Sequence, residues 1–299
     1  MLQTAKNFVR DSFRFVGLDV KRREAPLSTL ETYLRIYGED AVKHRRFYNF
    51  GAGGFRHAAW TNVDNPSDNY RHNFVDNRHL IAHDLDSRKP LPIESNSAHL
   101  AYTSHCIEHL RDDSVRRFFE EAHRILGDGG IFRVTAPDIE LCYRAYRRGD
   151  NDFFYWFAPH YDDPDAARKE GISLPTNGAS AAQIFLFAFA SSMSELHADG
   201  APQRLSDRAL ERVFDELGFE GALDDICAKC PPSVQQKYPW NHVSWWTKDK
   251  TIRFLREAGF EEVAVSAYGQ SLAAPLRDTN YFDATQPRVS FYVEAVKRA

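Results

Sequence analysis

Short apolar runs separated by polar turns recur along the chain between residues 46 and 137. Their length and their aromatic and β-branched content predict strands rather than helices. We expect five strands in this region, at Arg46–Phe50, Trp60–Asp64, Leu80–Asp84, Leu100–Ser104 and Ile131–Ala136. Between the last two strands, the apolar positions have a helical spacing. This spacing predicts a helix that begins at Asp112 and stops at Gly127.

The same alternation resumes near the C-terminal end. Thr247 can cap a helix that stops at Gly259. Alternating apolar positions at 263–267 and 289–295 predict two partner strands at an edge of the sheet. Strands that alternate with helices form an open, largely parallel sheet. We therefore expect an α/β fold with seven strands, mostly parallel, whose ligand site lies at the carboxyl ends of the strands.

The regular alternation stops after the fifth strand. This stretch contains an aromatic block at Phe153–Phe157, an apolar helical run at Ala179–Ala190 and a polar helix at Ser206–Leu217 that stops at Gly218. Long segments of this kind inside a compact domain are typically lids or insertions. We therefore predict an N-terminal helical segment at residues 1–45 and an α/β core formed by residues 46–140 and 241–299. Residues 141–240 are predicted to form a largely helical cap on the substrate side.

A glycine-rich turn, Gly51-Ala52-Gly53, follows the first strand. Glycines at a strand end let the backbone approach a ligand that a Cβ atom would exclude. A dinucleotide fingerprint would need a third glycine, but Arg56 stands there. It would also need an acid about 20 residues downstream, whereas Asp64 comes sooner. The turn and Asp64 instead favour a nucleoside without a pyrophosphate, whose ribose hydroxyls donate to the carboxylate.

The chain resembles the class I, Rossmann-like S-adenosylmethionine-dependent methyltransferases in three segments that occur in order: YNFGAGGFRHAAWTNVDN, HDLDSRKPLPIESNSAHLAYTSHCIEHL and FFEEAHRILGDGGIFRVTAPDIE. The likeness is closest to the broad group with an SSHxLEHL…LkPGGxL pattern. It covers about residues 46–140 and, more weakly, 242–297. The resemblance implies a Rossmann-like fold, S-adenosyl-L-methionine as the cofactor and methyl transfer as the activity.

The resemblance also implies roles for residues at the strand ends. The glycine turn would lie against the methionine part of the cofactor, and Asp64 would hold both ribose hydroxyls. The Asp84 carboxylate and the backbone amide of Leu85 would bind the adenine. Asp86 competes with Asp84 for this role, and Asp84 is preferred because it ends the apolar run. Ser104 and His105 would line the adenosine–methionine side.

His105, Glu108 and His109 also match the inverted zinc-peptidase motif H-x-x-E-H. Such a motif belongs inside a helix, whereas His105 follows directly on a strand, so we expect no metal. In a methyltransferase, His109 would overhang the transferred methyl as a candidate general base or substrate-orienting residue, with His105 as a second catalytic candidate. A purely structural role for His109 is an equal alternative.

The acceptor is expected to be a hydroxyl group on a small molecule or a saccharide, because no Asn/Asp-Pro-Pro-Tyr/Phe motif of amino-group methyltransferases follows the fourth strand. His160, Tyr161 and His197 of the insertion are the candidate substrate contacts. Two other functions stay open. One is a zinc-dependent hydrolase that uses the H-x-x-E-H residues, and the other is a non-catalytic protein that binds S-adenosylmethionine.

Composition narrows the choice of partners. The formal net charge is −4, without a basic stripe, so we expect no nucleic-acid partner. The longest apolar run, Ile184–Ala190, is far shorter than the roughly 20 residues of a bilayer span, so we expect no integral membrane association. Four scattered cysteines do not form a disulfide framework. These features indicate a cytoplasmic enzyme, for which a homodimer is one of the assemblies left open.

Overall fold

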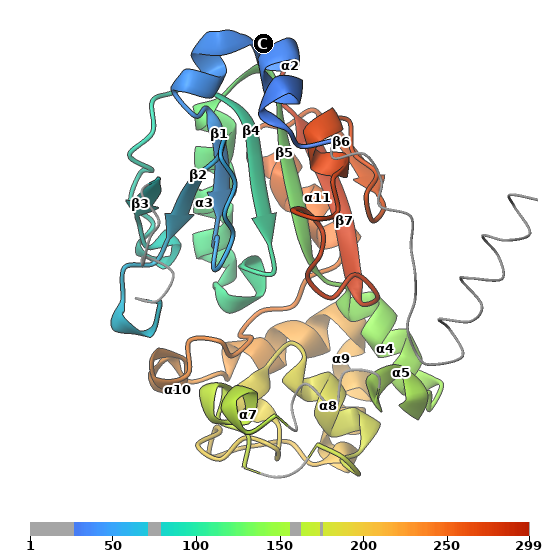
Figure 1. The fold of residues 1–299 in the computed structure, drawn as a ribbon. Coiled ribbons are helices and arrows are strands. Elements are labelled where there is room, and N and C mark those ends of the chain that lie inside the picture. Colours follow the sequence, from blue (N-terminus) through green and yellow to red (C-terminus); the bar gives the residue numbers. More distant parts are fainter. Residues whose placement is uncertain (1–26, 71–78, 156–162, 174–175, 299) are drawn as a thin grey trace, which may run out of the picture.

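The computed structural model describes residues 27–70, 79–155, 163–173 and 176–298. Within these segments the chain forms a seven-stranded sheet in the order β3-β2-β1-β4-β5-β7-β6 (Figure 1). The strands are β1 (Phe47–Phe50), β2 (Thr61–Asp64), β3 (Leu80–Ala82), β4 (Ala98–Ser104), β5 (Leu126–Pro137), β6 (Glu262–Ser266) and β7 (Ser290–Val296). β7 pairs antiparallel with β5 and β6, and the other pairs are parallel. The predicted fold class is confirmed, including the β6–β7 pair at one edge.

Helices cover both faces of the sheet. α3 (Asp112–Ile125) and α11 (Lys248–Glu257) contact each other and pack on one face. α11 begins after Thr247, whose side chain accepts a hydrogen bond from the backbone of Lys250, as predicted. α2 (Leu30–Lys43) contributes Tyr33 to a separate aromatic cluster with Trp60 and Phe282. The residues of the sheet therefore belong to two buried clusters, one shared with α3 and α11 and the other shared with α2.

The end of α3 differs from the prediction. Leu126 is already extended, with φ −66° and ψ 139°, so the helix stops at Ile125 and β5 begins at once. Gly127, the expected helix stop, instead lies inside β5 against the chain that leads into β4. A Cβ atom on Gly127 would lie 3.3 Å from the carbonyl oxygen of Asn96. The glycine permits this close approach of two backbones rather than ending the helix.

The connection between β1 and β2 contains no helix, because it is shorter than the dozen or so residues that a helical crossover between parallel strands needs. Residues 51–60 form irregular turns instead. Phe55 donates its backbone N–H to Ala52, and its carbonyl accepts from the Asn62 side chain at 2.7 Å. These bonds hold a short crossover close to the carboxyl ends of the first two strands, where it leaves room for a ligand.

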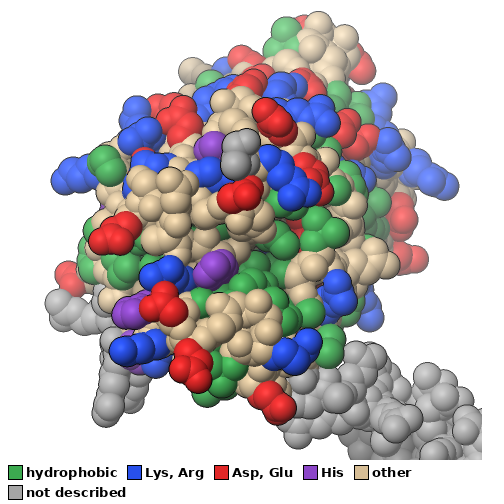
Figure 2. All heavy atoms as spheres, turned by 90° about the horizontal axis from the view of Figure 1, so that it is seen from above, with side chains coloured by type: hydrophobic (Ala, Val, Ile, Leu, Met, Phe, Trp, Pro, Cys, Tyr) green, Lys and Arg blue, Asp and Glu red, His purple; other side chains and the backbone are tan. Residues whose placement is uncertain are grey.

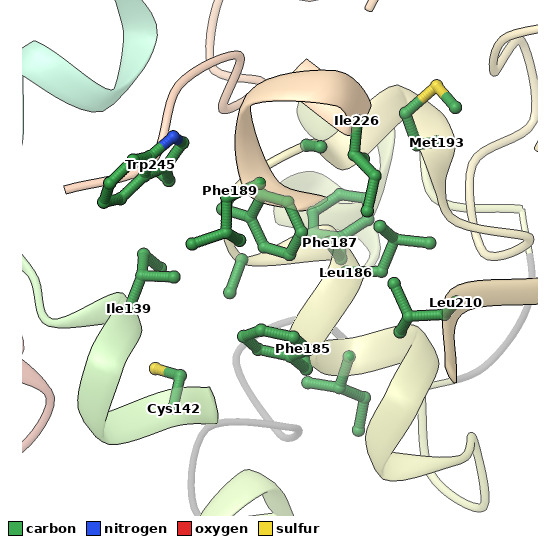
Figure 3. Close-up of a cluster of buried hydrophobic side chains, with 14 of the residues drawn as sticks. Ile139, Cys142, Phe185, Leu186, Phe187, Phe189, Met193, Leu210, Ile226 and Trp245 are labelled. Atoms are coloured by element: carbon green, nitrogen blue, oxygen red, sulfur yellow. The ribbon is translucent and has the colours of Figure 1, made fainter. Parts of the chain in front are cut away.

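A layer of helices lies below the carboxyl ends of the parallel strands in Figure 1. Its helices are α4 (Ile139–Arg147), α5 (Asn151–Tyr155), α7 (Pro164–Glu170), α8 (Ala181–Phe187), α9 (Asp207–Ala228) and α10 (Pro232–Lys237). The layer has its own buried core, in which Phe185, Phe189, Ile226 and Trp245 gather (Figure 3). α9 is interrupted at Gly218, the predicted helix stop, and continues beyond it.

The surface carries charges of both signs. On the face drawn in Figure 2, acidic and basic side chains of the described residues are interspersed rather than gathered by sign. Nucleic-acid interfaces cluster lysine and arginine on one face, which this side of the molecule does not do. Among the helices that the structure describes, none combines the length and the apolar character needed to cross a membrane.

Candidate active site

A cavity of about 640 Å³ opens at the carboxyl ends of the first four strands. Its walls come from the turn after β1, the ends of β2 and β3, the turn after β4, and α10 with the segment that follows it. Seven of the predicted site residues line it: Gly51, Gly53, Asp64, Asp84, Leu85, His105 and His109. The topology therefore brings together residues that are far apart in the sequence.

The two glycines of the turn after β1 serve different purposes. Gly51 has φ +62°, and a Cβ atom there would lie 2.4 Å from Cys106 Sγ, so the neighbouring side chain already fills that space. Gly53 has φ +51°, and a Cβ atom there would meet nothing within 4 Å. Its backbone N–H donates to Asp64 Oδ2 at 2.9 Å. Ala52, in contrast, is buried and is not among the residues that line the cavity.

Asp64 is 7% exposed and lies at the end of β2. One carboxylate oxygen accepts the Gly53 N–H, and the other accepts the backbone N–H of Asn65 at 2.8 Å. These two bonds fix the carboxylate in the cavity wall. Asn65 also donates its side-chain amide to Asp84 Oδ1 at 3.2 Å, so it connects the acids that follow β2 and β3.

Asp84 caps a short 3₁₀ turn, Leu85–Ser87, by accepting the backbone N–H of Asp86 at 3.0 Å. Asp86 also lines the cavity, and its carboxylate accepts the hydroxyl hydrogen of Ser114 at 2.6 Å. The structure therefore places both Asp84 and Asp86 at the β3 end of the cavity. A local helix cap and a ligand contact are compatible roles for Asp84, because a carboxylate offers about four acceptor positions.

His105 turns the chain sharply after β4. Its φ of +49° is unusual for a residue with a side chain. The ring lies between two groups, with Nε2 2.7 Å from Ser290 Oγ and Nδ1 3.3 Å from Glu108 Oε1. Ser104, which was predicted beside it, is not among the residues that line the cavity. His105, Glu108 and His109 do not share an α-helix, because a 3₁₀ turn, Ile107–His109, follows the strand directly.

The Glu108 carboxylate is 2% exposed and is surrounded by imidazoles. Burial by itself would raise its pKa, but His105, His109 and His242 outweigh burial and lower it. Burial, followed by the neighbouring His242, lowers the pKa of His109 to about 4. His109 is therefore a neutral imidazole at neutral pH, and it is a weak base.

Among the residues that the structure describes, none of the three predicted substrate contacts in the insertion lines the cavity. His160 and Tyr161 lie outside the described residues. His197 is fully buried and does not line the cavity, which corrects its assignment as a substrate contact. Its Nε2 lies 2.8 Å from Asn241 Oδ1, and the Asn241 carbonyl accepts a hydrogen bond from His109. Burial excludes His197 from direct contact with a ligand in the cavity.

Several cavity residues carry no signal in the sequence. Tyr70 donates its hydroxyl hydrogen to the carbonyl of Pro239 at 3.1 Å, and its ring centre lies 5.5 Å from that of Trp240. This contact joins the segment after β2 to the segment after α10, 169 residues further along the chain. Local spacing cannot pair such positions, because the contact depends on how the helical layer packs below the sheet.

Comparison with known proteins finds a family match for part of the chain. Residues 56–134, from the crossover after β1 into β5, match the family model described as a methyltransferase domain. Among solved structures, the chain is similar to an S-adenosylmethionine-dependent methyltransferase from Thermotoga maritima, with 14% identity over 87% of this chain and 86% of that chain and a TM-score of 0.37. A second, from Mesorhizobium loti, shows 16% identity over 84% and 90% of the two chains, with a TM-score of 0.37. No curated protein matches.

The assignment rests on the family match and on the observed sheet. The matched segment contains the ends of β2, β3 and β4, which supply most of the strand-end residues of the cavity. The sheet is Rossmann-like, with parallel strands and a single antiparallel strand, β7, within the described residues. Residues 56–134 therefore match a methyltransferase domain, and they lie within a Rossmann-like sheet.

Proposed function

We propose that the cavity binds S-adenosylmethionine and that the enzyme methylates a hydroxyl group of a small molecule or a saccharide. The observation that carries the first part is the arrangement of the cavity wall. A glycine turn and the acids after β2 and β3 line one cavity of about 640 Å³, a volume typical of sites for ligands of this size.

The residues of this wall fit an adenosine-containing ligand. The open space above Gly53 admits a ligand close to the backbone. Asp64, held by two backbone N–H groups, is the proposed acceptor for the ribose hydroxyls. Asp84 and Leu85 are the proposed contacts of the adenine. When bound, S-adenosylmethionine supplies a methyl group that is already activated on a sulfonium, so the protein's contribution is to position the acceptor and exclude water.

The helical segment 141–240 is the proposed acceptor-side cap. Pro232 and Gln235 of α10, together with Pro239 and Trp240, line the cavity opposite the strand ends. The contact between Tyr70 and Trp240 closes part of that side. We therefore assign cofactor binding to the strand ends and acceptor binding to the cap.

His109 is the proposed acceptor-orienting residue. It lines the cavity and its lowered pKa keeps the imidazole neutral, so the ring can accept a hydrogen bond from a hydroxyl group. The same low pKa makes it a poor general base. His105 is a positioning residue in this proposal, because both of its ring nitrogens face protein groups.

Ligand binding and methyl transfer, measured separately, test the proposal. Calorimetry should show binding of S-adenosylhomocysteine but not of NAD, and the ligand should raise the melting temperature because it binds only the folded state. A screen with methyl-labelled S-adenosylmethionine against sugars, nucleotide sugars and phenols should then place the label on oxygen. Label on nitrogen would overturn the acceptor assignment, and binding without turnover on any acceptor would favour a non-catalytic protein.

A further inference from the structure

A cluster of three side chains beside the cavity has no role in the proposed cofactor site. Glu108 and His109 come from the 3₁₀ turn after β4, and His242 comes from the segment that joins the helical layer to α11. One ligand atom from each residue lies within 4.8 Å of the other two. His109 and His242 also contact each other edge to face, with ring centres 4.8 Å apart.

Backbone carbonyls determine which nitrogen of each imidazole carries the proton. His109 Nδ1 lies 3.2 Å from the carbonyl oxygen of Asn241, and His242 Nδ1 lies 2.6 Å from that of Ala188. Since a carbonyl oxygen only accepts, both Nδ1 atoms are donors. Nε2 of each ring is therefore the nitrogen whose lone pair can bind an ion. Histidines that bind metals commonly donate their second nitrogen to such a partner, which fixes the tautomer and the ring orientation.

The Glu108 carboxylate adds further lone pairs to the same place. It is 2% exposed, and neither oxygen accepts a hydrogen bond of good geometry. The His105 Nδ1 atom, 3.3 Å from Oε1, is close without making one. A buried carboxylate without a hydrogen bond of good geometry is costly, and a cation bound at its oxygens would offset that cost.

We propose that Glu108, His109 and His242 bind a divalent metal ion. Two imidazoles and one carboxylate form a donor set typical of zinc and other borderline divalent ions, and three protein ligands leave at least one position for an exogenous oxygen. Zinc ligands bind at about 2.0–2.2 Å, so the ion would draw the three side chains closer together. This proposal differs from the expectation of no metal that the sequence alone gave. The proposed ligands are Glu108 and His109 of the H-x-x-E-H motif together with His242, and His105 is not one of them.

The open position has a function if the proposed methyltransferase activity holds, and that part of the inference rests on it. His109 lines the cavity, so an ion on this residue lies at the cavity wall. The acceptor oxygen would then bind the ion, and this contact would replace the hydrogen bond to His109 proposed above. A bound divalent ion holds a hydroxyl oxygen in place and lowers its pKa.

The test measures metal binding directly. Tag-free protein is treated with a chelator, dialysed and titrated with Co²⁺, whose visible absorption reports the geometry of the site; Zn²⁺ is then added as a competitor. Wild-type protein should bind one ion per chain. Glu108→Gln and His242→Ala should weaken binding by roughly 100-fold or more, with circular dichroism as the check on folding. The control is His99→Ala, a half-buried histidine at the opposite end of β4.

A parallel titration with S-adenosylhomocysteine separates this inference from the proposed function. Binding of S-adenosylhomocysteine without stoichiometric Co²⁺ or Zn²⁺ would overturn the metal site and leave the proposed function standing. Stoichiometric metal binding without binding of S-adenosylhomocysteine would overturn the proposed function and leave the metal site standing. Equal metal affinity in wild type, Glu108→Gln and His242→Ala would show that the ion binds elsewhere, and it would overturn the assignment of these ligands.

Discussion

At the scale of single residues, Asp64 combines a structural and a proposed binding role. Replacing it by asparagine keeps the shape but removes the charge. We expect Asp64→Asn to weaken S-adenosylhomocysteine binding by about 1.5–3 kcal/mol, the typical value for hydrogen bonds to a charged group. Calorimetry on the purified variant gives this number. Asp128→Asn, an exposed aspartate in β5, is the control, and equal affinity in both variants would make Asp64 a turn residue only.

The two glycines after β1 offer a second comparison between single residues. Both have positive φ, so an alanine at either position is strained by about 1–2 kcal/mol. At Gly51 the new Cβ atom would also collide with Cys106, whereas at Gly53 it would enter open space. Urea unfolding should show that Gly51→Ala lowers the free energy of unfolding by about 1–3 kcal/mol more than Gly53→Ala does. Equal losses would mean that the Cys106 contact relaxes freely.

At the scale of elements, α9 shows how one residue divides a helix. Gly218 has φ 69° and ψ −175°, a conformation open essentially only to glycine. We expect Gly218→Ala to cost about 1–3 kcal/mol of unfolding free energy. Gly221→Ala is the matched control in the same element, where the added Cβ would make only ordinary contact with Leu217, 3.4 Å away. That variant should gain about 0.5–1 kcal/mol. Equal effects in denaturant melts would argue against a required break.

Element boundaries were predictable where a local signal acts alone. Thr247 caps α11 and Gly218 interrupts α9 as expected, because each effect involves only neighbouring residues. Gly127 did not end α3, because the pairing of β5 with β4 recruits Leu126 into the sheet. The end of α3 therefore depends on strand pairing with residues that are distant in the sequence.

At the scale of the whole molecule, the cavity lies between the sheet and the helical layer. If the two parts divide the work as proposed, Trp240→Ala should raise the KM for the acceptor and leave the affinity for S-adenosylhomocysteine near wild type. Trp240→Phe should restore much of the acceptor KM, because it keeps a ring that can contact Tyr70. Steady-state kinetics on the acceptor found by the screen, with calorimetry beside it, measures both quantities. Loss of S-adenosylhomocysteine binding in Trp240→Ala would make the cap part of the cofactor site.

The sequence by itself determined the strands, their mostly parallel arrangement and one wall of the cavity. Apolar alternation marks each strand, and parallel strands bring their carboxyl ends to one edge, so Gly53, Asp64 and Asp84 could be placed together without coordinates. Their neighbours Ala52 and Ser104 do not line the cavity, because the orientation of a side chain at a strand end depends on the turn that follows.

Only the tertiary structure decided what surrounds Glu108. The local H-x-x-E-H spacing pointed to His105 and His109, but the turn after β4 and the packing of the helical layer bring His242 into the cluster instead. The carbonyl that orients His109 belongs to Asn241, 132 residues away. The same packing buries His197 behind Asn241. Such contacts join segments that share no periodic pattern, so they exist only once the helical layer has docked against the strand ends.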